Sequence, residues 1–156
     1  MSVKGTFLKR FLRRGSPEEK ERPAEYFSRR MGDSYADFWD GMAKTREGAY
    51  YGVAGLPFGE PATEESLDRH GEMTARIIVD KLGISKEDVV LEVGVGVGRL
   101  AKHIAPVCRE FHGVDISANM IRHARERLKS LKNIFLYTHH SSDLSIFPKE
   151  KFNVVY

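Results

Sequence analysis

The sequence predicts an α/β fold: an open parallel sheet with helices on both faces, preceded by a helical N-terminal region. The apolar run Val89–Val93 is typical of a buried strand and leads directly into a glycine-rich turn. A second short apolar run, Glu110–Val114, ends at the carboxylate Asp115. From residue 89 onward, such runs alternate with segments of helical period, and this alternation predicts a parallel sheet.

Composition sets the broad class. The chain has 156 residues, of which 41% are hydrophobic and 30% charged, as in a soluble globular domain. The net charge is only +3 and the basic residues are interspersed with acidic ones, so we expect no nucleic-acid partner. The single Cys108 and the lack of a long apolar run or secretory leader predict a cytoplasmic protein.

The first 60 residues are expected to form a basic arm and a helical extension, and residues 61–156 the sheet-containing domain. Apolar and basic residues alternate over residues 7–14 as in a short amphipathic helix, which suits an organelle presequence, an arm that docks on a membrane surface or a partner, or a loosely folded terminus. A further helix is predicted to start near Ser16-Pro17. Glycine and proline in residues 48–61 predict a loop.

Aromatic residues mark one face of a helix just before this loop. Tyr35, Phe38 and Trp39 lie on that face. They are interpreted either as core residues or as a cover over a cofactor.

The elements after residue 61 follow in a regular order. An amphipathic helix with Met73, Ile77, Ile78 and Leu82 on one face is expected to end at Gly83. After the strand at 89–93, a helix over about 100–105 ends at Pro106, and Ser117 caps a helix that runs to about Ser130. The predicted strands are 89–93, 110–114, 134–137 and 152–156. Because the last strand has no turn or tail after it, we expect a fragment of a longer protein.

The glycine turn distinguishes between two cofactor classes. A dinucleotide fingerprint reads G-x-G-x-x-G, whereas this turn has glycines at 94, 96 and 98 and places Arg99 where that fingerprint needs a small residue. Glu92, two residues before the first glycine, would repel a diphosphate and attract a cation. The pattern therefore favours a cationic ligand over a dinucleotide.

These segments resemble the class I S-adenosylmethionine-dependent methyltransferases, which have a Rossmann-like fold. The family's first motif, an acidic residue followed by G-x-G-x-G, matches residues 92–98. Residues 113–117 with Met120, residues 142–144 and residues 152–156 are similar to its later strand segments. The resemblance extends from about residue 71 to the end of the chain.

The resemblance implies a set of S-adenosyl-L-methionine contacts. Gly94, Gly96 and Gly98 form the turn, with the first two beside the methionine part and Glu92 near its ammonium group. Asp115 would accept both ribose hydroxyls, as a carboxylate can. The adenine would contact Ile116 and Met120 on its faces and Ser142 and Asp143 at its edge.

Two positions depart from the family pattern. His139-His140 stands where many relatives have an acidic residue, and Asn153 replaces the usual aspartate of the fourth strand. The adjacent histidines have no third ligand at a suitable spacing, so no metal site is expected.

The resemblance implies a methyltransferase acting on an unidentified small-molecule acceptor, with no catalytic residue assignable. An NAD-binding oxidoreductase domain and a cofactor-binding fragment without turnover are the alternatives. Tighter binding of NAD than of S-adenosylhomocysteine would favour the first alternative.

Overall fold

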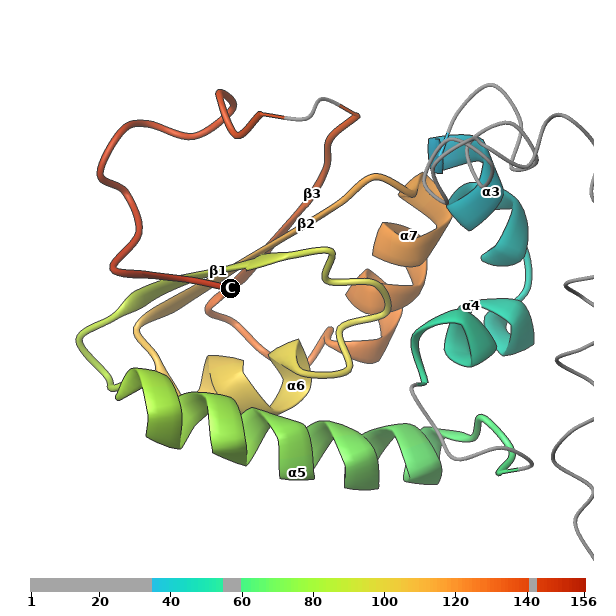
Figure 1. The fold of residues 1–156 in the computed structure, drawn as a ribbon, viewed down its shortest axis with the longest axis horizontal. Helices are drawn as coiled ribbons and strands as arrows, with labels where there is room; N and C mark the ends of the chain where they lie inside the picture. Colours follow the sequence, from blue (N-terminus) through green and yellow to red (C-terminus); the bar gives the residue numbers. More distant parts are fainter. Residues whose placement is uncertain (1–34, 55–59, 141–142) are drawn as a thin grey trace, which may run out of the picture. The chain divides into compact units, whose positions relative to one another are not determined.

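A four-stranded parallel sheet organises the part of the chain that the structure describes (Figure 1). The computed structural model describes residues 35–54, 60–140 and 143–156. The strands are β1 (Val89–Val93), β2 (Glu110–Asp115), β3 (Ile134–Thr138) and β4 (Val154–Val155). Their order is β3-β2-β1-β4 and every neighbouring pair is parallel, which confirms the predicted open parallel α/β sheet.

Helices precede the sheet and connect its strands. They are α3 (Tyr35–Met42), α4 (Arg46–Val53), α5 (Glu64–Leu82), α6 (Ala101–Ile104) with the 3₁₀ turn Ala105–Val107, and α7 (Ala118–Arg127). Residues 36–156 form one compact unit. Among the described residues, no helix is long and apolar enough to span a bilayer. The predictions for the basic arm and for the helix start at Ser16 concern residues outside the described ranges.

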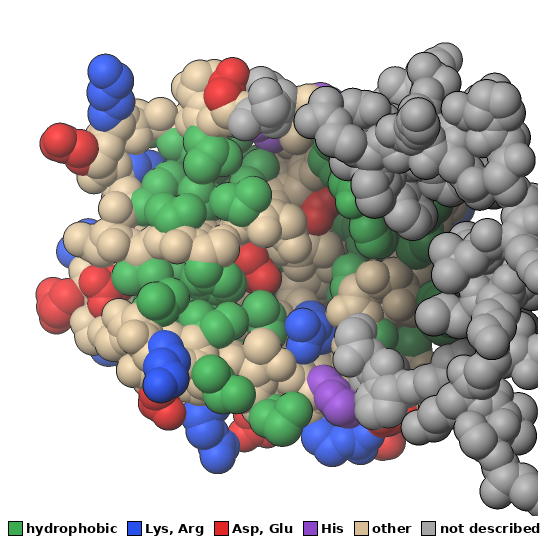
Figure 2. Space-filling model, in the orientation of Figure 1, with side chains coloured by type: hydrophobic (Ala, Val, Ile, Leu, Met, Phe, Trp, Pro, Cys, Tyr) green, Lys and Arg blue, Asp and Glu red, His purple; other side chains and the backbone are tan. Residues whose placement is uncertain are grey.

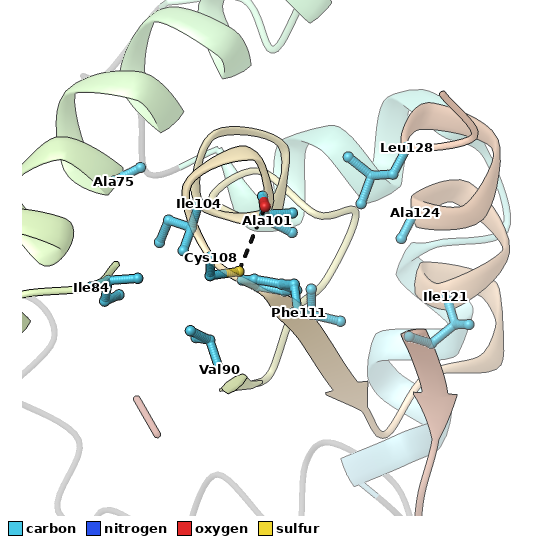
Figure 3. Packing of buried hydrophobic residues seen from close by; sticks show 12 residues of the cluster. Ala75, Ile84, Val90, Ala101, Ile104, Cys108, Phe111, Ile121, Ala124 and Leu128 are labelled. Atoms are coloured by element: carbon cyan, nitrogen blue, oxygen red, sulfur yellow. Dashed lines mark hydrogen bonds between the residues drawn. The ribbon is translucent and has the colours of Figure 1, made fainter. Parts of the chain in front are cut away.

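One face of the sheet carries the main hydrophobic core. Phe111 of β2 is fully buried there, among side chains of α5, α6 and α7 (Figure 3). Its burial contributes about 1.5–3 kcal/mol. Cys108 lies in the same cluster, and burial raises the pKa of its thiol to about 11. Helices separated along the chain therefore share one core beneath the sheet.

The other face of the sheet carries an aromatic cluster. His112 is 1% exposed and stacks on the rings of Phe135 and Tyr137 of β3, with centroids 4.8 and 5.8 Å away. Phe147 and Phe152 meet its ring edge to face from the segment that leads to β4. In the described part of the chain, loop aromatics thus cover the region of this face around His112, and burial lowers the pKa of His112.

The loop predicted over residues 48–61 is wrong in its first part, where α4 forms. Thr45 caps this helix by accepting a hydrogen bond from the Gly48 amide at 3.1 Å. The two glycines of α4 serve close packing: a Cβ on Gly48 would lie 2.1 Å from the Met42 carbonyl oxygen, and one on Gly52 would lie 2.7 Å from the Met42 sulfur. Packing and capping therefore outweigh the low helix propensity of glycine.

Helix α5 ends where predicted but packs through a different face. Gly83 is left-handed (φ 65°) and closes the helix. Met73, Ile77 and Leu82, predicted to face the core, are 58%, 57% and 48% exposed. Small residues allow close approach instead, because a Cβ on Gly71 would lie 2.5 Å from the Arg99 carbonyl oxygen.

Two predicted elements are present but shorter. Ser117 caps α7 as predicted, through a hydrogen bond from the Met120 amide, but the helix ends at Arg127. Strand β4 is limited to two residues. Asn153 aligns it, since its side-chain oxygen accepts the Val89 N–H at 3.0 Å and its own N–H donates to the Val89 carbonyl at 2.9 Å.

Candidate cofactor site

The turn after β1 depends on three left-handed glycines. Gly94, Gly96 and Gly98 have φ angles of 81°, 53° and 75°. A Cβ on Gly94 would meet nothing within 4 Å, whereas one on Gly96 would lie 2.7 Å from Val53 and one on Gly98 2.3 Å from Leu128. The first glycine therefore borders open space, and the other two allow α4 and α7 to pack against the turn.

Glu92 lies at the end of β1 and is 6% exposed. Burial raises the pKa of its carboxyl to about 8, and the charge of Asp115 acts in the same direction, whereas the nearby Arg99 and the Tyr156 hydroxyl favour ionisation. Within the described residues, its buried Oε2 has no hydrogen-bond partner. Such a group is costly unless something pairs with it, and a cationic ligand would do so.

Asp115 ends β2 opposite the glycine turn. Its Oδ2 accepts the Gly96 N–H at 2.8 Å and its Oδ1 accepts the Ser117 N–H at 2.9 Å. Each oxygen retains a lone pair, so the carboxylate can accept two further hydrogen bonds. The structure thus brings Glu92, the glycines and Asp115 together at the carboxyl ends of β1 and β2.

Asp40 of α3 is a residue that sequence reasoning missed. Its carboxylate accepts the Ser117 hydroxyl at 2.8 Å, the Asn119 N–H at 2.8 Å and the Asn119 side-chain amide at 2.9 Å. The hydrogen bond from the Asn119 backbone is the main cause of its lowered pKa. No sequence signal links Asp40 to Ser117, because 77 residues separate them.

The residues expected at the adenine lie where α3 and α4 meet α7. Met120 is 1% exposed and belongs to a second hydrophobic cluster, against which Trp39 packs. Ile116 is half-buried in the turn before α7. Packing of Trp39 against this cluster agrees with its interpretation as a core residue, while adenine contacts of Ile116 and Met120 remain predictions.

Sequence reasoning also missed Arg127, which contacts the last glycine of the turn. Its side chain is 3% exposed and donates to the Gly98 carbonyl at 2.8 Å, to Glu64 at 2.7 Å and to Asp68. Burial opposes ionisation of Glu64, but hydrogen bonds from Tyr50 and Arg127, with the charge of Arg127, lower its pKa to about 2. A buried, fully paired arginine therefore fixes the end of the glycine turn.

The segment expected at the adenine edge is described only in part. Ser142 lies outside the described residues. The exposed Asp143 accepts the Ser145 N–H on its carboxylate at 2.9 Å, and its carbonyl oxygen lies 2.9 Å from the ring nitrogen of His139. Its role at the adenine stays a prediction.

This fold and site define the class of protein. The methyltransferase domain family matches residues 90–156. A solved structure of an S-adenosylmethionine-dependent methyltransferase from Aquifex aeolicus superimposes with a TM-score of 0.51 at 18% identity, covering 58% of this chain and 52% of that one. Residues 90–156 of the chain thus match a methyltransferase domain, and the fold is Rossmann-like, as in S-adenosylmethionine-dependent methyltransferases.

Two curated relatives are similar to part of the chain. A ribosomal RNA small subunit methyltransferase A from Clostridium botulinum is 36% identical over 59 residues, 38% of this chain and 22% of that protein. An uncharacterized methyltransferase from Schizosaccharomyces pombe is 34% identical over 79 residues, 51% of this chain and 30% of that protein. The chain therefore spans less than a third of either relative's length.

The first of these relatives corrects one expectation. Absence of a nucleic-acid partner was inferred from the modest charge of +3. That inference is wrong, because a matching relative is named for its action on ribosomal RNA. The net charge is a sum over the whole surface, whereas nucleic acid is recognised by a local patch of basic residues.

The site fits S-adenosylmethionine, the cofactor of this family. The unpartnered Oε2 of Glu92 suits an ammonium group, and the open space at Gly94 admits a ligand close to the backbone. Asp115 has acceptor capacity left for ribose hydroxyls. The dinucleotide alternative fits less well, because a buried carboxylate would oppose a diphosphate.

Proposed function

We propose that the protein containing this chain is a methyltransferase that holds S-adenosylmethionine at the ends of β1 and β2. The observation that carries this proposal is the buried carboxylate of Glu92, whose Oε2 has no partner within the described residues. It lies beside a turn of three left-handed glycines and near Asp115. When bound, the cofactor supplies an electrophilic methyl group for transfer to an acceptor.

The residues of this chain contribute binding and orientation. Glu92 pairs with the ammonium group, and the backbone at Gly94 and Gly96 follows the methionine part. Asp115 holds the ribose, while Ile116, Met120, Ser142 and Asp143 surround the adenine. Methyl transfer depends more on alignment of the methyl group with the acceptor and on exclusion of water than on acid-base chemistry. The residues of this chain therefore assist the reaction by binding and orienting the cofactor.

Calorimetric titration of the full 156-residue chain tests the cofactor. We expect S-adenosylhomocysteine to bind and NAD not to compete with it. Asp115→Ala removes the ribose acceptor and should weaken binding about tenfold or more. Asp80→Ala, which removes an exposed carboxylate on α5, is the matched control and should leave binding unchanged. Tighter binding of NAD would overturn the proposal in favour of the oxidoreductase alternative.

The acceptor requires a separate experiment. Transfer of a radiolabelled methyl group is measured in parallel to ribosomal RNA and to a panel of small-molecule amines and alcohols. The RNA arm follows from the relative named for ribosomal RNA, and the small-molecule arm from the expectation drawn from sequence. A protein that binds the cofactor but labels neither class would support the alternative of binding without turnover.

The domain division at residue 60 and the cytoplasmic location stay predictions. Expression of residues 61–156 alone tests the division: an independent domain would unfold cooperatively, whereas the α4 contacts with α7 argue that α3 and α4 contribute to its stability.

A further inference from the structure

One buried serine connects two aspartates that lie far apart in the sequence. Ser117 is fully buried; its N–H donates to Asp115 at 2.9 Å and its hydroxyl donates to Asp40 at 2.8 Å. Its hydroxyl oxygen also accepts the Met120 N–H at 3.1 Å. Ser117 therefore bonds to both aspartates and caps α7 at the same time.

Asp40 is anchored on the other side by Asn119. The Asn119 side-chain amide donates to the Asp40 carboxylate at 2.9 Å and to its backbone carbonyl at 3.1 Å, and the Asn119 N–H donates at 2.8 Å. Helix α3 is thus attached to the first turn of α7 by several charge-assisted hydrogen bonds, which are stronger than neutral ones. Helix α3 can shift only if these bonds break.

We propose that Asp40 is a positioning residue for the cofactor ribose, acting through Ser117 on Asp115. Asp40 accepts the Ser117 hydroxyl and the Asn119 N–H, which fixes the backbone at the start of α7 and with it the Ser117 N–H that donates to Oδ1 of Asp115. The Asp115 carboxylate, held from the other side by the Gly96 N–H at 2.8 Å, is then fixed in the orientation that accepts two ribose hydroxyls. This inference rests on the proposed cofactor site and adds a residue from outside the segment that matches the family.

Helix α4 reinforces the arrangement. A Cβ on Gly96 would lie 2.7 Å from Val53, so α4 lies directly against the glycine whose N–H holds Asp115. Helices α3 and α4 therefore both act on the same carboxylate, α3 through Ser117 and α4 through Gly96. If α3 and α4 served only to stabilise the fold, their contacts would not both need to lead to the Asp115 side chain.

The decisive experiment compares two ligands on Asp40→Asn. Calorimetry measures binding of S-adenosylhomocysteine and of its 2′-deoxy analogue, which lacks one ribose hydroxyl. The wild type should prefer the first ligand. In the variant, the two amide groups of residues 40 and 119 face each other, so we expect about tenfold weaker binding of S-adenosylhomocysteine but less than about twofold change for the analogue. Equal weakening of both ligands would show a general structural role and overturn the inference.

A reciprocal exchange provides the rescue. In the double variant Asp40→Asn, Asn119→Asp, the amide and the carboxylate change places and can bond again, so most of the preference for the ribose hydroxyl should return. Failure of this rescue, together with an unchanged preference in Asp40→Asn, would contradict the proposal. Glu47→Gln, which neutralises an exposed carboxylate on α4, is the control and should bind both ligands like the wild type.

Folding of each variant is followed by the fluorescence of Trp39, the only tryptophan of the chain and the neighbour of Asp40. If Asp40→Asn unfolds, Asn119→Ala replaces it, because it retains the Asn119 N–H and the Ser117 contact; a partial loss of preference is then expected, and no loss overturns the inference. If the folded wild type binds no S-adenosylhomocysteine, the proposed function itself fails. If it binds but the preference is insensitive to Asp40, only this inference fails.

Discussion

Burial of the Glu92 carboxyl lowers the stability of the folded chain, but it also provides a group that can bind a cationic ligand. Its carboxyl is 6% exposed and its pKa is raised by burial to about 8, from an ordinary value of 4.5. The folded protein therefore retains a proton on this group in a pH range where the unfolded chain has lost it. A cationic ligand would remove this cost by pairing with the ionised carboxylate.

The pH dependence of stability should reveal this group. Since the folded pKa lies above the unfolded one, the contribution of Glu92 is most favourable below pH 4.5 and is lost as pH rises toward 8. Glu92→Gln does not titrate, so relative to this variant the wild type should lose up to about 1.4 kcal/mol per pH unit between those limits. Urea unfolding at pH 5, 6, 7 and 8 measures the difference. A constant difference across the series would contradict the raised pKa.

At the scale of elements, contacts between helices and the glycine turn shape the site. The first turn of α7 donates a hydrogen bond to Asp40. At the other end of the helix, Arg127 donates to the Gly98 carbonyl and Leu128, the residue after the helix, packs beside Gly98. Helix α4, predicted as a loop, lies against Gly96 through Val53. The strand and the glycines were predictable because they are local in sequence, whereas these partners come from segments whose contacts depend on the folded chain.

The packing of α7 against the turn can be measured with two glycines. Gly98→Ala and Gly83→Ala both place a side chain at positive φ, 75° and 65°, but a Cβ meets Leu128 at 2.3 Å in the first case and nothing within 4 Å in the second. We expect Gly83→Ala to cost about 1 kcal/mol and Gly98→Ala about 1–3 kcal/mol more, because of overpacking. Chemical unfolding of both variants gives the comparison. Equal losses in the free energy of unfolding would mean that Leu128 moves aside without strain.

At the scale of the whole molecule, the sheet face that carries the aromatic cluster around His112 is only partly covered. Its register places Leu91, His112, Phe135 and Val155 on the same side. The aromatic cluster protects His112, but Phe135, Val93 and Val155 remain 43%, 53% and 52% exposed. Figure 2 shows hydrophobic side chains gathered on the surface of the strand region. A patch of this kind favours association.

We therefore expect weak, concentration-dependent self-association of the 156-residue chain. Val155→Lys places a charge in the patch and should raise the concentration for half-association about tenfold. Leu82→Lys makes the same change at a residue that is 48% exposed on α5, which packs on the other face, and is the matched control. Light scattering over a dilution series measures both. An equal effect of the two variants would assign the change to net charge alone.

The sequence by itself determined the strands, the left-handed cap at Gly83, the Ser117 cap and the glycine turn with Glu92 and Asp115. Each depends on local pattern: apolar runs, capping residues and glycines at fixed spacing. Only the tertiary structure decided that α4 is a helix, that α5 packs through Gly71 and Ala75, and that Asp40 and Arg127 hold the site. Those features depend on side chains separated by tens of residues, so their energy exists only once the chain has folded.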